Sequence, residues 1–308
     1  MISIALLGTA ALMPLPDRAL TSAVLSCGGR SILFDCGEGT QIAARRHGVS
    51  LMKTDVMALT HYHGDHIFGI PGLLLTLARQ GRTDPLTILG PEGLEEALDP
   101  IRKLIDPLPF ALRLRECSDE PLRLCELAHG WPVGAFLGSF ATEHRISSRG
   151  YVFRLERPGR FLPDKARALG VPPEQWKRLQ KGSSVLLGEA LITPEQVMGP
   201  PRRGLRVVFS GDTTACASLT EAARDADLLI CEGTYGEDSQ AELAAKYGHM
   251  TFSQAAGVAA RAGARTLWLA HYSRMIADPE IYLPAARALF PNTVCGRDGM
   301  TTELHFEE

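Results

Sequence analysis

The segment His61-Tyr-His-Gly-Asp-His66 places three imidazoles and one carboxylate within six residues. It follows a short apolar run, Asp55 to Thr60, which predicts a buried strand that ends in a loop. The first two histidines are two positions apart, so in extended chain their side chains point to the same face and can reach one ion. The glycine lets the backbone turn, after which Asp65 and His66 would face a second ion.

This set of donors is typical of a metal site. Imidazole nitrogen and carboxylate oxygen bind zinc and other borderline divalent metals at about 2.0–2.2 Å. The alternative is a solvated loop that is rich in histidine by chance. That alternative explains neither the spacing of the histidines nor the distant donors described next, so a metal site is the better interpretation.

Two metal ions need more donors than one loop can supply, and three further residues follow predicted strands. His144 comes after Gly138-Ser-Phe-Ala-Thr142, Asp212 ends Val207-Val-Phe-Ser-Gly-Asp, and His271 follows Thr266-Leu-Trp-Leu-Ala. A carboxylate has two oxygens, so Asp212 is suited to bridging both ions. Each of these residues alone is better interpreted as a hydrogen-bonded structural group. Together with the first segment they favour metal ligation.

The composition is that of a globular chain that can bury a substantial core. The sequence has 308 residues, of which 45% are hydrophobic, and this favours one large domain or one domain with an insertion. No apolar run approaches the roughly 18–20 residues needed to cross a membrane, and the first residues lack the features of a signal peptide. We therefore expect a cytoplasmic protein with no membrane partner. The net charge of −3 gives no general attraction to nucleic acid.

The seven cysteines give no sign of a disulfide framework. They are odd in number and scattered, and none forms a Cys-x-x-Cys pair. The same scatter argues against a thiolate zinc cluster, and buried reduced thiols fit better.

Strand, loop and helix patterns alternate along the chain. Ile2 to Leu7 predicts a strand, and the runs at 23–25 and 31–34 predict a hairpin that closes at Gly28-Gly29. Apolar strands are predicted again at 205–209, 227–231 and 266–270, with helices at 215–226 and 253–263. With functional residues at strand ends, this order indicates an α/β protein whose site lies along one edge of its sheets.

Residues 154–204 differ in composition from the rest of the chain and predict an inserted arm. The stretch is rich in proline and glycine, and its ten Lys and Arg against five Asp and Glu give a local charge of +5. Recognition of nucleic-acid backbones rests on Lys and Arg, so this charge is a modest argument for phosphate contact. An exposed surface segment that has no binding partner is an equally open interpretation.

These residues together resemble the metallo-β-lactamase superfamily, whose His-x-His-x-Asp-His signature corresponds to His61, His63, Asp65 and His66. Within that superfamily the chain resembles the ribonuclease Z family of tRNA 3′-end processing endoribonucleases. The resemblance extends over nearly the whole chain, through Leu7-Gly-Thr9, Phe34-Asp-Cys-Gly-Glu-Gly-Thr-Gln41, Leu169-Gly-Val-Pro-Pro173, Gly199-Pro-Pro201, Ser210-Gly-Asp-Thr213 and Gly248-His249.

The resemblance implies a four-layer αββα sandwich, formed by residues 1–308 with the arm inserted, and a pair of metal ions at the sheet edge. One ion would be held by His61, His63 and His144. The other would be held by Asp65, His66 and His271, with Asp212 between the two. Two zinc ions are expected, although such sites also accept manganese or iron.

The implied reaction is metal-dependent hydrolysis of a phosphodiester that removes the 3′ trailer from precursor tRNA. A pair of metal ions lowers the pKa of a water and neutralises charge on the attacked phosphate. Asp65 is the candidate to orient or deprotonate that water. By the resemblance, His249 would protonate the leaving 3′ oxygen and Glu232 would orient and charge its imidazole. Alternatively, His249 packs or caps before the helix that follows.

The residues that would read the substrate depart from the family pattern. The Pro-x-Lys-x-Arg-Asn loop of the family reads Pro14-Leu-Pro-Asp-Arg-Ala19 here, and its Ser-Ser-Arg reads Ser273-Arg-Met275. Arg18 and Arg274 are the candidate substrate-binding residues.

Two other functions therefore stay open. One is a dinuclear-metal hydrolase of a small phosphodiester, cyclic nucleotide or ester. The other is a nucleic-acid-binding protein that does not cleave, although the complete set of ligands argues against it. The family is commonly dimeric, so a homodimer is also implied.

Overall fold

The computed structural model describes residues 1–105 and 107–307. Within these residues the strands form two sheets of seven strands and one sheet of two. The chain divides into a larger unit, Met1–Arg154 with Arg206–His305, and a smaller unit, Leu155–Leu205 with the C-terminal residues from Phe306 onward. Each unit has its own core.

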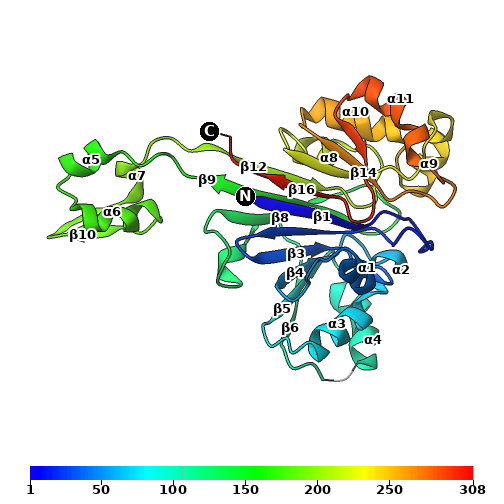
Figure 1. The fold of residues 1–308 in the computed structure, drawn as a ribbon, viewed down its shortest axis with the longest axis horizontal. Helices are drawn as coiled ribbons and strands as arrows, with labels where there is room; N and C mark the ends of the chain where they lie inside the picture. The colour runs from blue at the N-terminus through cyan, green and yellow to red at the C-terminus, as the bar shows by residue number, and fades with distance from the viewer. Residues whose placement is uncertain (106, 308) are drawn as a thin grey trace. The chain divides into compact units, whose positions relative to one another are not determined.

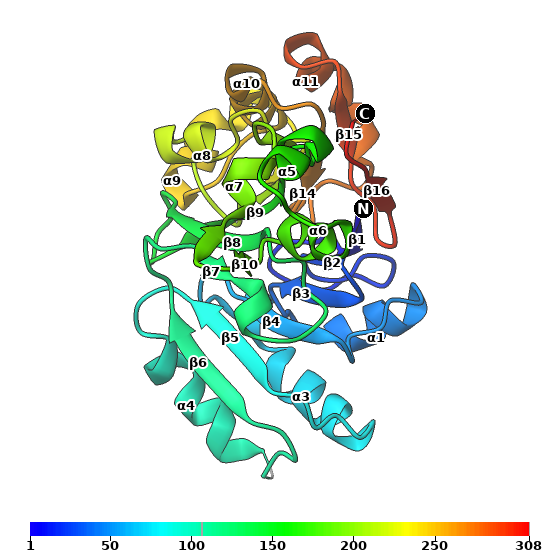
Figure 2. The same ribbon diagram turned by 90° about the vertical axis from the view of Figure 1, so that its left-hand side faces the viewer.

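The first sheet of the larger unit begins with antiparallel strands and continues with parallel ones. Its order is β16 (Thr301–Leu304), β1 (Ile2–Gly8), β2 (Ser22–Cys27), β3 (Arg30–Phe34), β4 (Thr54–Ala58), β5 (Leu86–Gly90) and β6 (Leu112–Glu116). Pairing is antiparallel from β16 to β3 and parallel from β3 to β6. Parallel neighbours need crossover connections, which contain α1 (Thr40–Arg46), α2 (Gly64–Ile67), α3 (Ile70–Arg79) and α4 (Leu94–Leu104). Figure 2 shows α1, α3 and α4 beside these strands.

The predicted hairpin between β2 and β3 is confirmed. Gly28 and Gly29 form its turn with φ angles of 61° and 80°. Positive φ at both central residues is the requirement of the two-residue turn whose twist matches that of the strands, and glycine meets it without steric cost.

The second sheet supplies the other half of the sandwich. Its order is β15 (Thr293–Cys295), β14 (Leu267–Ala270), β13 (Leu228–Glu232), β12 (Arg202–Phe209), β9 (Arg149–Arg157), β8 (Ala135–Ala141) and β7 (Leu122–Arg123). Strands β12 to β15 are parallel. The helices of this half are α8 (Ala217–Ala222), α9 (Ala241–Tyr247), α10 (Phe252–Ala262) and α11 (Leu283–Leu289). Short 3₁₀ turns occur at Leu124–Glu126, Asp238–Gln240 and Pro279–Ile281.

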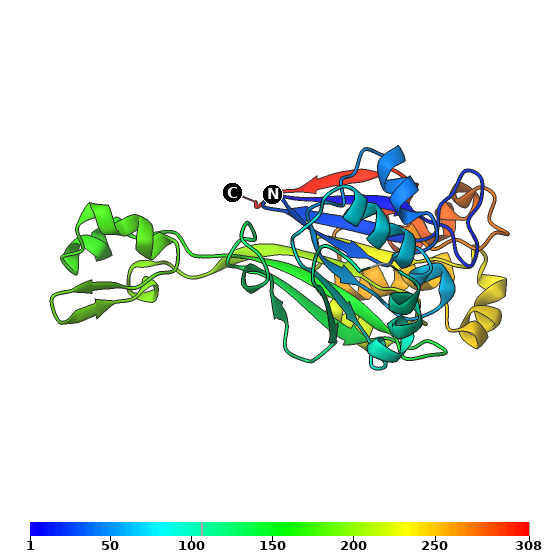
Figure 3. The same ribbon diagram turned by 90° about the horizontal axis from the view of Figure 1, so that it is seen from below.

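Helices cover the outer face of each sheet, which confirms the predicted four-layer αββα sandwich. Figure 1 shows α8, α10 and α11 above the strands and α3 and α4 below them, and Figure 3 views the molecule from the side of α3 and α4. Between the sheets, the rings of Phe34 and Phe209 stack with centroids 5.2 Å apart. The layers are thus joined by one inner core and by an outer core on each side.

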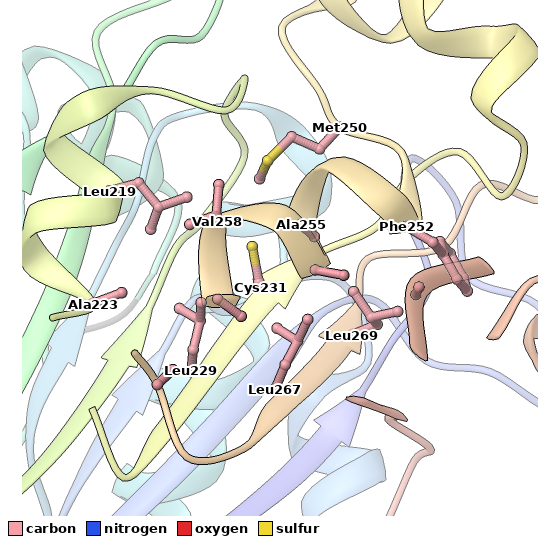
Figure 4. Packing of buried hydrophobic residues seen from close by; sticks show 14 of the residues in the cluster. Leu219, Ala223, Leu229, Cys231, Met250, Phe252, Ala255, Val258, Leu267 and Leu269 are labelled. Atoms are coloured by element: carbon pink, nitrogen blue, oxygen red, sulfur yellow. The ribbon is translucent and has the colours of Figure 1, made fainter. Parts of the chain in front are cut away.

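The outer core beneath α10 is built from small residues on the helix and larger ones on the strands. Ala255 and Val258 of α10 face Leu229, Leu267 and Leu269 of β13 and β14, and all are fully buried (Figure 4). Alanine lets a helix approach the sheet closely, so α10 is fixed against the strands that end at the candidate site. Close packing of this kind makes the ends of β13 and β14 rigid.

The smaller unit contains three short helices and one hairpin. These are α5 (Pro163–Ala168), α6 (Pro173–Gln180), β10 (Val185–Leu187), β11 (Ala190–Ile192) and α7 (Pro194–Val197). Its buried core consists of Ala166, Val171, Leu179, Val185, Ile192 and Val197. The chain enters this unit along β9 and leaves it along β12.

None of the helices in residues 1–105 and 107–307 combines the length and apolar character needed to cross a bilayer.

Candidate metal centre

The ends of four strands of the larger unit position the predicted metal donors. His61 and His63 follow β4, and His63 directly precedes α2, the short helix that carries Asp65 and His66. The sequence indicated only a turn here. Because α2 places its two donors on successive residues of one helical turn, both remain beside the loop that carries the first two histidines. The other donors follow the strand ends of β8, β12 and β14 and are His144, Asp212 and His271.

The first group of donors surrounds one point. The Nδ1 atom of His63 lies 2.9 Å from His61 Nε2 and 3.3 Å from His144 Nε2. Asp212 Oδ2 lies 3.6 Å from His61 Nε2. The donor atoms of these four residues, three histidines and Asp212, lie within 4.8 Å of one another, so a single ion could contact them all.

The second group lies on the other side of Asp212. The Oδ2 atom of Asp65 is 3.6 Å from both His66 Nε2 and His271 Nε2. Asp212 reaches His66 Nε2 with Oδ2 at 3.4 Å and His271 Nε2 with Oδ1 at 3.3 Å. Asp212 therefore contacts both groups, as expected of a residue that bridges two ions.

Two histidine nitrogens show that these residues fit a divalent metal. The Nε2 atoms of His66 and His271 are buried and have no hydrogen-bond partner. Leaving buried polar atoms without partners is costly, and each of these nitrogens faces a carboxylate at a distance that leaves room for a cation. The donor set of imidazoles and carboxylates is the one that divalent transition metals prefer. The site is compatible with divalent metal ions.

Asp35 supports one histidine of each group. This buried residue follows β3 with a φ of 55°, and its carboxylate accepts hydrogen bonds from the Thr60 N–H at 2.7 Å and from His66 Nδ1 at 2.8 Å. The hydroxyl of Thr60 donates to Asp35 Oδ2 at 2.9 Å and lies 3.0 Å from His61 Nδ1. Such contacts fix the orientation of the ring that binds metal. Sequence reasoning assigned no role to Asp35, although an acidic residue at a strand end was a usable signal.

His144 and His271 are oriented by other partners. His144 Nδ1 donates to the backbone carbonyl of Gly248 at 2.8 Å, and His271 Nδ1 lies 3.0 Å from the hydroxyl of Thr234. Thr234 in turn donates to Glu232 Oε2 at 2.7 Å. Each of these histidines therefore turns its Nε2 atom toward the centre.

Burial and charge set the protonation of the donors. Burial lowers the pKa of His61 well below its ordinary value and also lowers the pKa of His63 and His144, so these rings are neutral and able to bind metal. Burial raises the pKa of Asp212, but the nearby His271 and His66 outweigh it and hold that pKa far below the usual range. Both oxygens of Asp212 are therefore available as ligands.

Glu232, the last residue of β13, holds His249. Its Oε1 atom lies 2.9 Å from His249 Nδ1 and accepts the backbone N–H of Thr213 at 2.8 Å, while Oε2 accepts the N–H of Met250 at 3.1 Å. Burial lowers the pKa of His249, but the charge and hydrogen bond of Glu232 outweigh it and raise that pKa to about 9. The imidazole is therefore protonated at neutral pH and held in one orientation.

A cleft of about 700 Å³ opens onto these residues. It is lined by His63, Asp65, His144, Asp212 and His249 and also by the apolar side chains of Leu12, Met13 and Phe68. Asp65 Oδ2 accepts the backbone N–H of Leu12 at 2.8 Å. Four of the seven donors, the histidine with a raised pKa and several exposed apolar side chains thus line one cavity.

The structure does not bring the two candidate substrate-binding arginines into this cleft. Arg18 donates to the carbonyls of Ile276 and Ala277 at 3.0 and 3.2 Å, and its guanidinium lies 5.3 Å from the ring centroid of Tyr272. Arg274 is exposed and contacts the sulfur of Met13 at 3.9 Å. Neither belongs to the described lining of the cleft, so their binding of substrate stays a prediction.

Comparisons with known proteins identify the family. One family model, described as Anti-Pycsar protein Apyc1, matches residues 2–100, and another, described as Beta-lactamase superfamily domain, matches residues 196–272. Ribonuclease Z of Lachnospira eligens is 41% identical over 310 residues, which covers 100% of this chain and 99% of that protein. Ribonuclease Z of Clostridium acetobutylicum is 39% identical over 311 residues, with 100% and 99% covered. The chain belongs to the ribonuclease Z family.

Solved structures agree with this family at the level of the fold. Human tRNase Z, short form (ELAC1), has a TM-score of 0.67 and 24% identity, with 99% of this chain and 100% of that chain covered. The metallo-beta-lactamase fold protein YhfI from Bacillus subtilis has a TM-score of 0.66 and 20% identity, with 98% of each chain covered. The chain therefore has the metallo-β-lactamase fold, and as a member of the ribonuclease Z family it is a hydrolytic enzyme.

Proposed function

We propose that this protein is a metal-dependent endoribonuclease that removes the 3′ trailer from precursor tRNA and leaves a 3′ hydroxyl. Its full-length similarity to proteins named ribonuclease Z supports this function. The observation that carries the proposal is that the donor groups and the Glu232–His249 pair line or adjoin one cleft.

Two zinc ions would be held by the two groups of donors. His61, His63 and His144 would bind one ion, Asp65, His66 and His271 the other, and Asp212 would contact both. When bound, such ions lower the pKa of a water and offset the negative charge of the attacked phosphate. Manganese or iron would satisfy the same donors.

The other steps belong to side chains of the chain itself. Asp65, fixed by the N–H of Leu12, orients the attacking water and accepts the proton that the water loses. The oxygen of that water joins phosphorus as the bond from phosphorus to the 3′ oxygen breaks. His249, kept protonated by Glu232, gives its proton to the departing 3′ oxygen.

Cleavage of a labelled precursor tRNA tests the proposal. Wild-type protein supplied with zinc or manganese should release the trailer with a 5′ phosphate and leave a 3′ hydroxyl on the tRNA. Asp65→Ala and His249→Ala should each lose most of this cleavage. Cleavage that persists in both variants would count against the proposed site, and turnover of bis(p-nitrophenyl) phosphate without tRNA cleavage would favour a small phosphodiester as substrate.

A homodimer and a cytoplasmic location remain part of the proposal. The family resemblance supports the dimer, and sedimentation equilibrium of the full chain would measure it directly. A monomer that cleaves precursor tRNA at full rate would remove the dimer from the proposal without affecting the chemistry.

A further inference from the structure

The cleft is lined by acidic groups and, apart from its histidines, by a single described cationic side chain. Asp65, Asp212 and Glu38 contribute negative charge, whereas Arg145 is the one arginine or lysine among the described lining residues. Bound metal ions would offset the charge of the two aspartates at the scissile phosphate. A second phosphate of an RNA strand needs a cation of its own, since each phosphate carries one negative charge.

The backbone fixes Arg145 beside the segment that carries His249. Arg145 follows His144, whose Nδ1 atom donates to the Gly248 carbonyl at 2.8 Å. Gly248 has a φ of 75°, and a Cβ added to it would lie 3.3 Å from the backbone nitrogen of Arg145, so the two segments are in close contact. The guanidinium carbon of Arg145 lies 5.8 Å from the ring centroid of Tyr247, which also lines the cleft.

The guanidinium of Arg145 is not neutralised by the protein. Its side chain is exposed, and in residues 1–105 and 107–307 no carboxylate forms an ion pair with it. The contact with the Tyr247 ring alone explains little, because an exposed cation–π contact stabilises by only about 0.5–1 kcal/mol. A guanidinium group at the wall of a catalytic cleft is suited to bind two oxygens of one phosphate at once.

We propose that Arg145 binds the phosphate on the 5′ side of the last retained nucleotide, next to the scissile phosphodiester. This inference rests on the proposed function. His249 gives its proton to the leaving 3′ oxygen, so the retained 3′ end must lie on the His249 side of the cleft. Arg145 lies on that same side, one residue from His144 and in contact with Tyr247.

Binding of the retained strand tests this contact without turnover. The probe is a fluorescent acceptor-stem RNA with a single-stranded 3′ end, with either a natural phosphate or an uncharged methylphosphonate on the 5′ side of its last nucleotide. Arg145→Ala should weaken binding of the natural RNA about tenfold, the lower range for a hydrogen bond to a charged group. The methylphosphonate should weaken wild-type binding similarly, yet cause little further loss in Arg145→Ala.

Matched variants separate this role from a structural one. Arg145→Lys keeps the charge and should recover part of the affinity, whereas Arg79→Ala, an exposed arginine of α3, should bind like wild type. The proposal is wrong if the fold losses of affinity caused by Arg145→Ala and by the methylphosphonate multiply when the two changes are combined. It is also wrong if Arg145→Ala binds the natural RNA as tightly as wild type does, or if wild-type protein does not bind it. This assay measures binding alone. A failure of the proposed tRNA processing would instead appear in the cleavage assay described above.

Discussion

At the scale of single residues, Glu232 connects two parts of the proposed chemistry. Its carboxylate holds the imidazole of His249, and through the Thr234 hydroxyl it also reaches the metal-facing His271. Glu232 is buried at the end of β13, where its remaining lone pairs are satisfied by backbone N–H groups. It is therefore held in place and can fix both the position and the charge of His249.

The role of His249 as an acid predicts a dependence on the leaving group. His249→Ala should lower the rate of precursor tRNA cleavage by roughly 10²–10⁴, the usual contribution of a positioned acid or base. The same variant should lose far less activity toward bis(p-nitrophenyl) phosphate, because p-nitrophenolate departs without a proton. Steady-state rates on both substrates measure the difference. Equal losses on the two substrates would show that His249 instead supports the metal site.

The same residue predicts the alkaline limit of the reaction. Burial alone would lower the pKa of His249, but Glu232 raises it to about 9, so the rate of RNA cleavage should fall as pH rises through about 9. In Glu232→Gln the carboxylate is gone, and the fall should move to lower pH. A pH–rate profile of kcat for both proteins tests this. An unchanged alkaline limit in Glu232→Gln would contradict the assignment.

Folding stability should follow the same protonation. The pKa of His249 in the folded chain lies above its ordinary value of 6.5, so its stabilising contribution is fully present below pH 6.5 and is lost as pH rises through about 9. The stability difference between wild type and His249→Ala should therefore shrink over that interval. Urea unfolding at a series of pH values measures it, and a difference that grows with pH would have the wrong sign.

At the scale of elements, the loop after β12 must approach the loop after β4 closely. Gly211 has a φ of 61°, and a Cβ added there would lie 2.7 Å from the Cβ of Thr60, which orients His61. Gly211→Ala should displace Thr60 and the neighbouring Asp212, and the purified protein should contain less metal. Elemental analysis against wild type provides the measurement.

Gly81→Ala is the matched control. Gly81 has a similar φ of 83°, but its added Cβ would meet nothing within 4 Å. Both substitutions carry the cost of positive φ, roughly 1–2 kcal/mol for a residue with a Cβ, whereas only Gly211→Ala collides with a neighbour. Equal metal content in the two variants would show that the Thr60 contact does not support the metal site.

The order of elements was largely predictable because its signals are local. The strand Ile2–Gly8 and the glycine turn of the β2–β3 hairpin follow from alternation and from the need for positive φ. The helix predicted at 253–263 is α10, Phe252–Ala262, which Thr251 caps by accepting the N–H of Gln254. Such patterns depend on a few neighbouring residues.

The supporting contacts were not predictable, because they join residues far apart in the chain. The place of Asp35 at a strand end marks it as a candidate polar group, but its neighbours in the sequence do not indicate which residues it holds. Likewise, nothing near Gly248 indicates that its carbonyl orients His144. The seven donors could be proposed because four of them share one short motif and the other three follow predicted strands. The positions of Arg18 and Arg145 depended on the tertiary structure of loops, which no periodic pattern encodes.

At the scale of the whole molecule, the smaller unit offers a separate cationic surface. Arg157, Arg160, Arg202 and Arg203 border a cavity of about 320 Å³ within that unit. Phosphate contacts release counterions, so each one contributes about 0.9 to the slope of log affinity against log salt for duplex nucleic acid. The four arginines are therefore candidates for contact with the body of the tRNA.

The variant Arg160→Ala/Arg202→Ala tests this contact. We expect weaker binding of precursor tRNA and a salt slope that is shallower by about 2, with turnover of bis(p-nitrophenyl) phosphate unchanged because that substrate is small. Binding measured at several salt concentrations decides the matter. A slope equal to that of wild type would show that the unit does not contact the phosphate backbone through these arginines.

The metal content of the purified full-length protein tests the central claim most directly. Seven side chains from the ends of four strands turn their donor atoms toward two points that share Asp212, and this arrangement has a chemical purpose only if cations occupy both points. We expect elemental analysis to find two equivalents of divalent metal per chain in wild-type protein and fewer in Asp212→Ala. Wild-type protein that contains no metal and takes up neither zinc, manganese nor iron would contradict the claim.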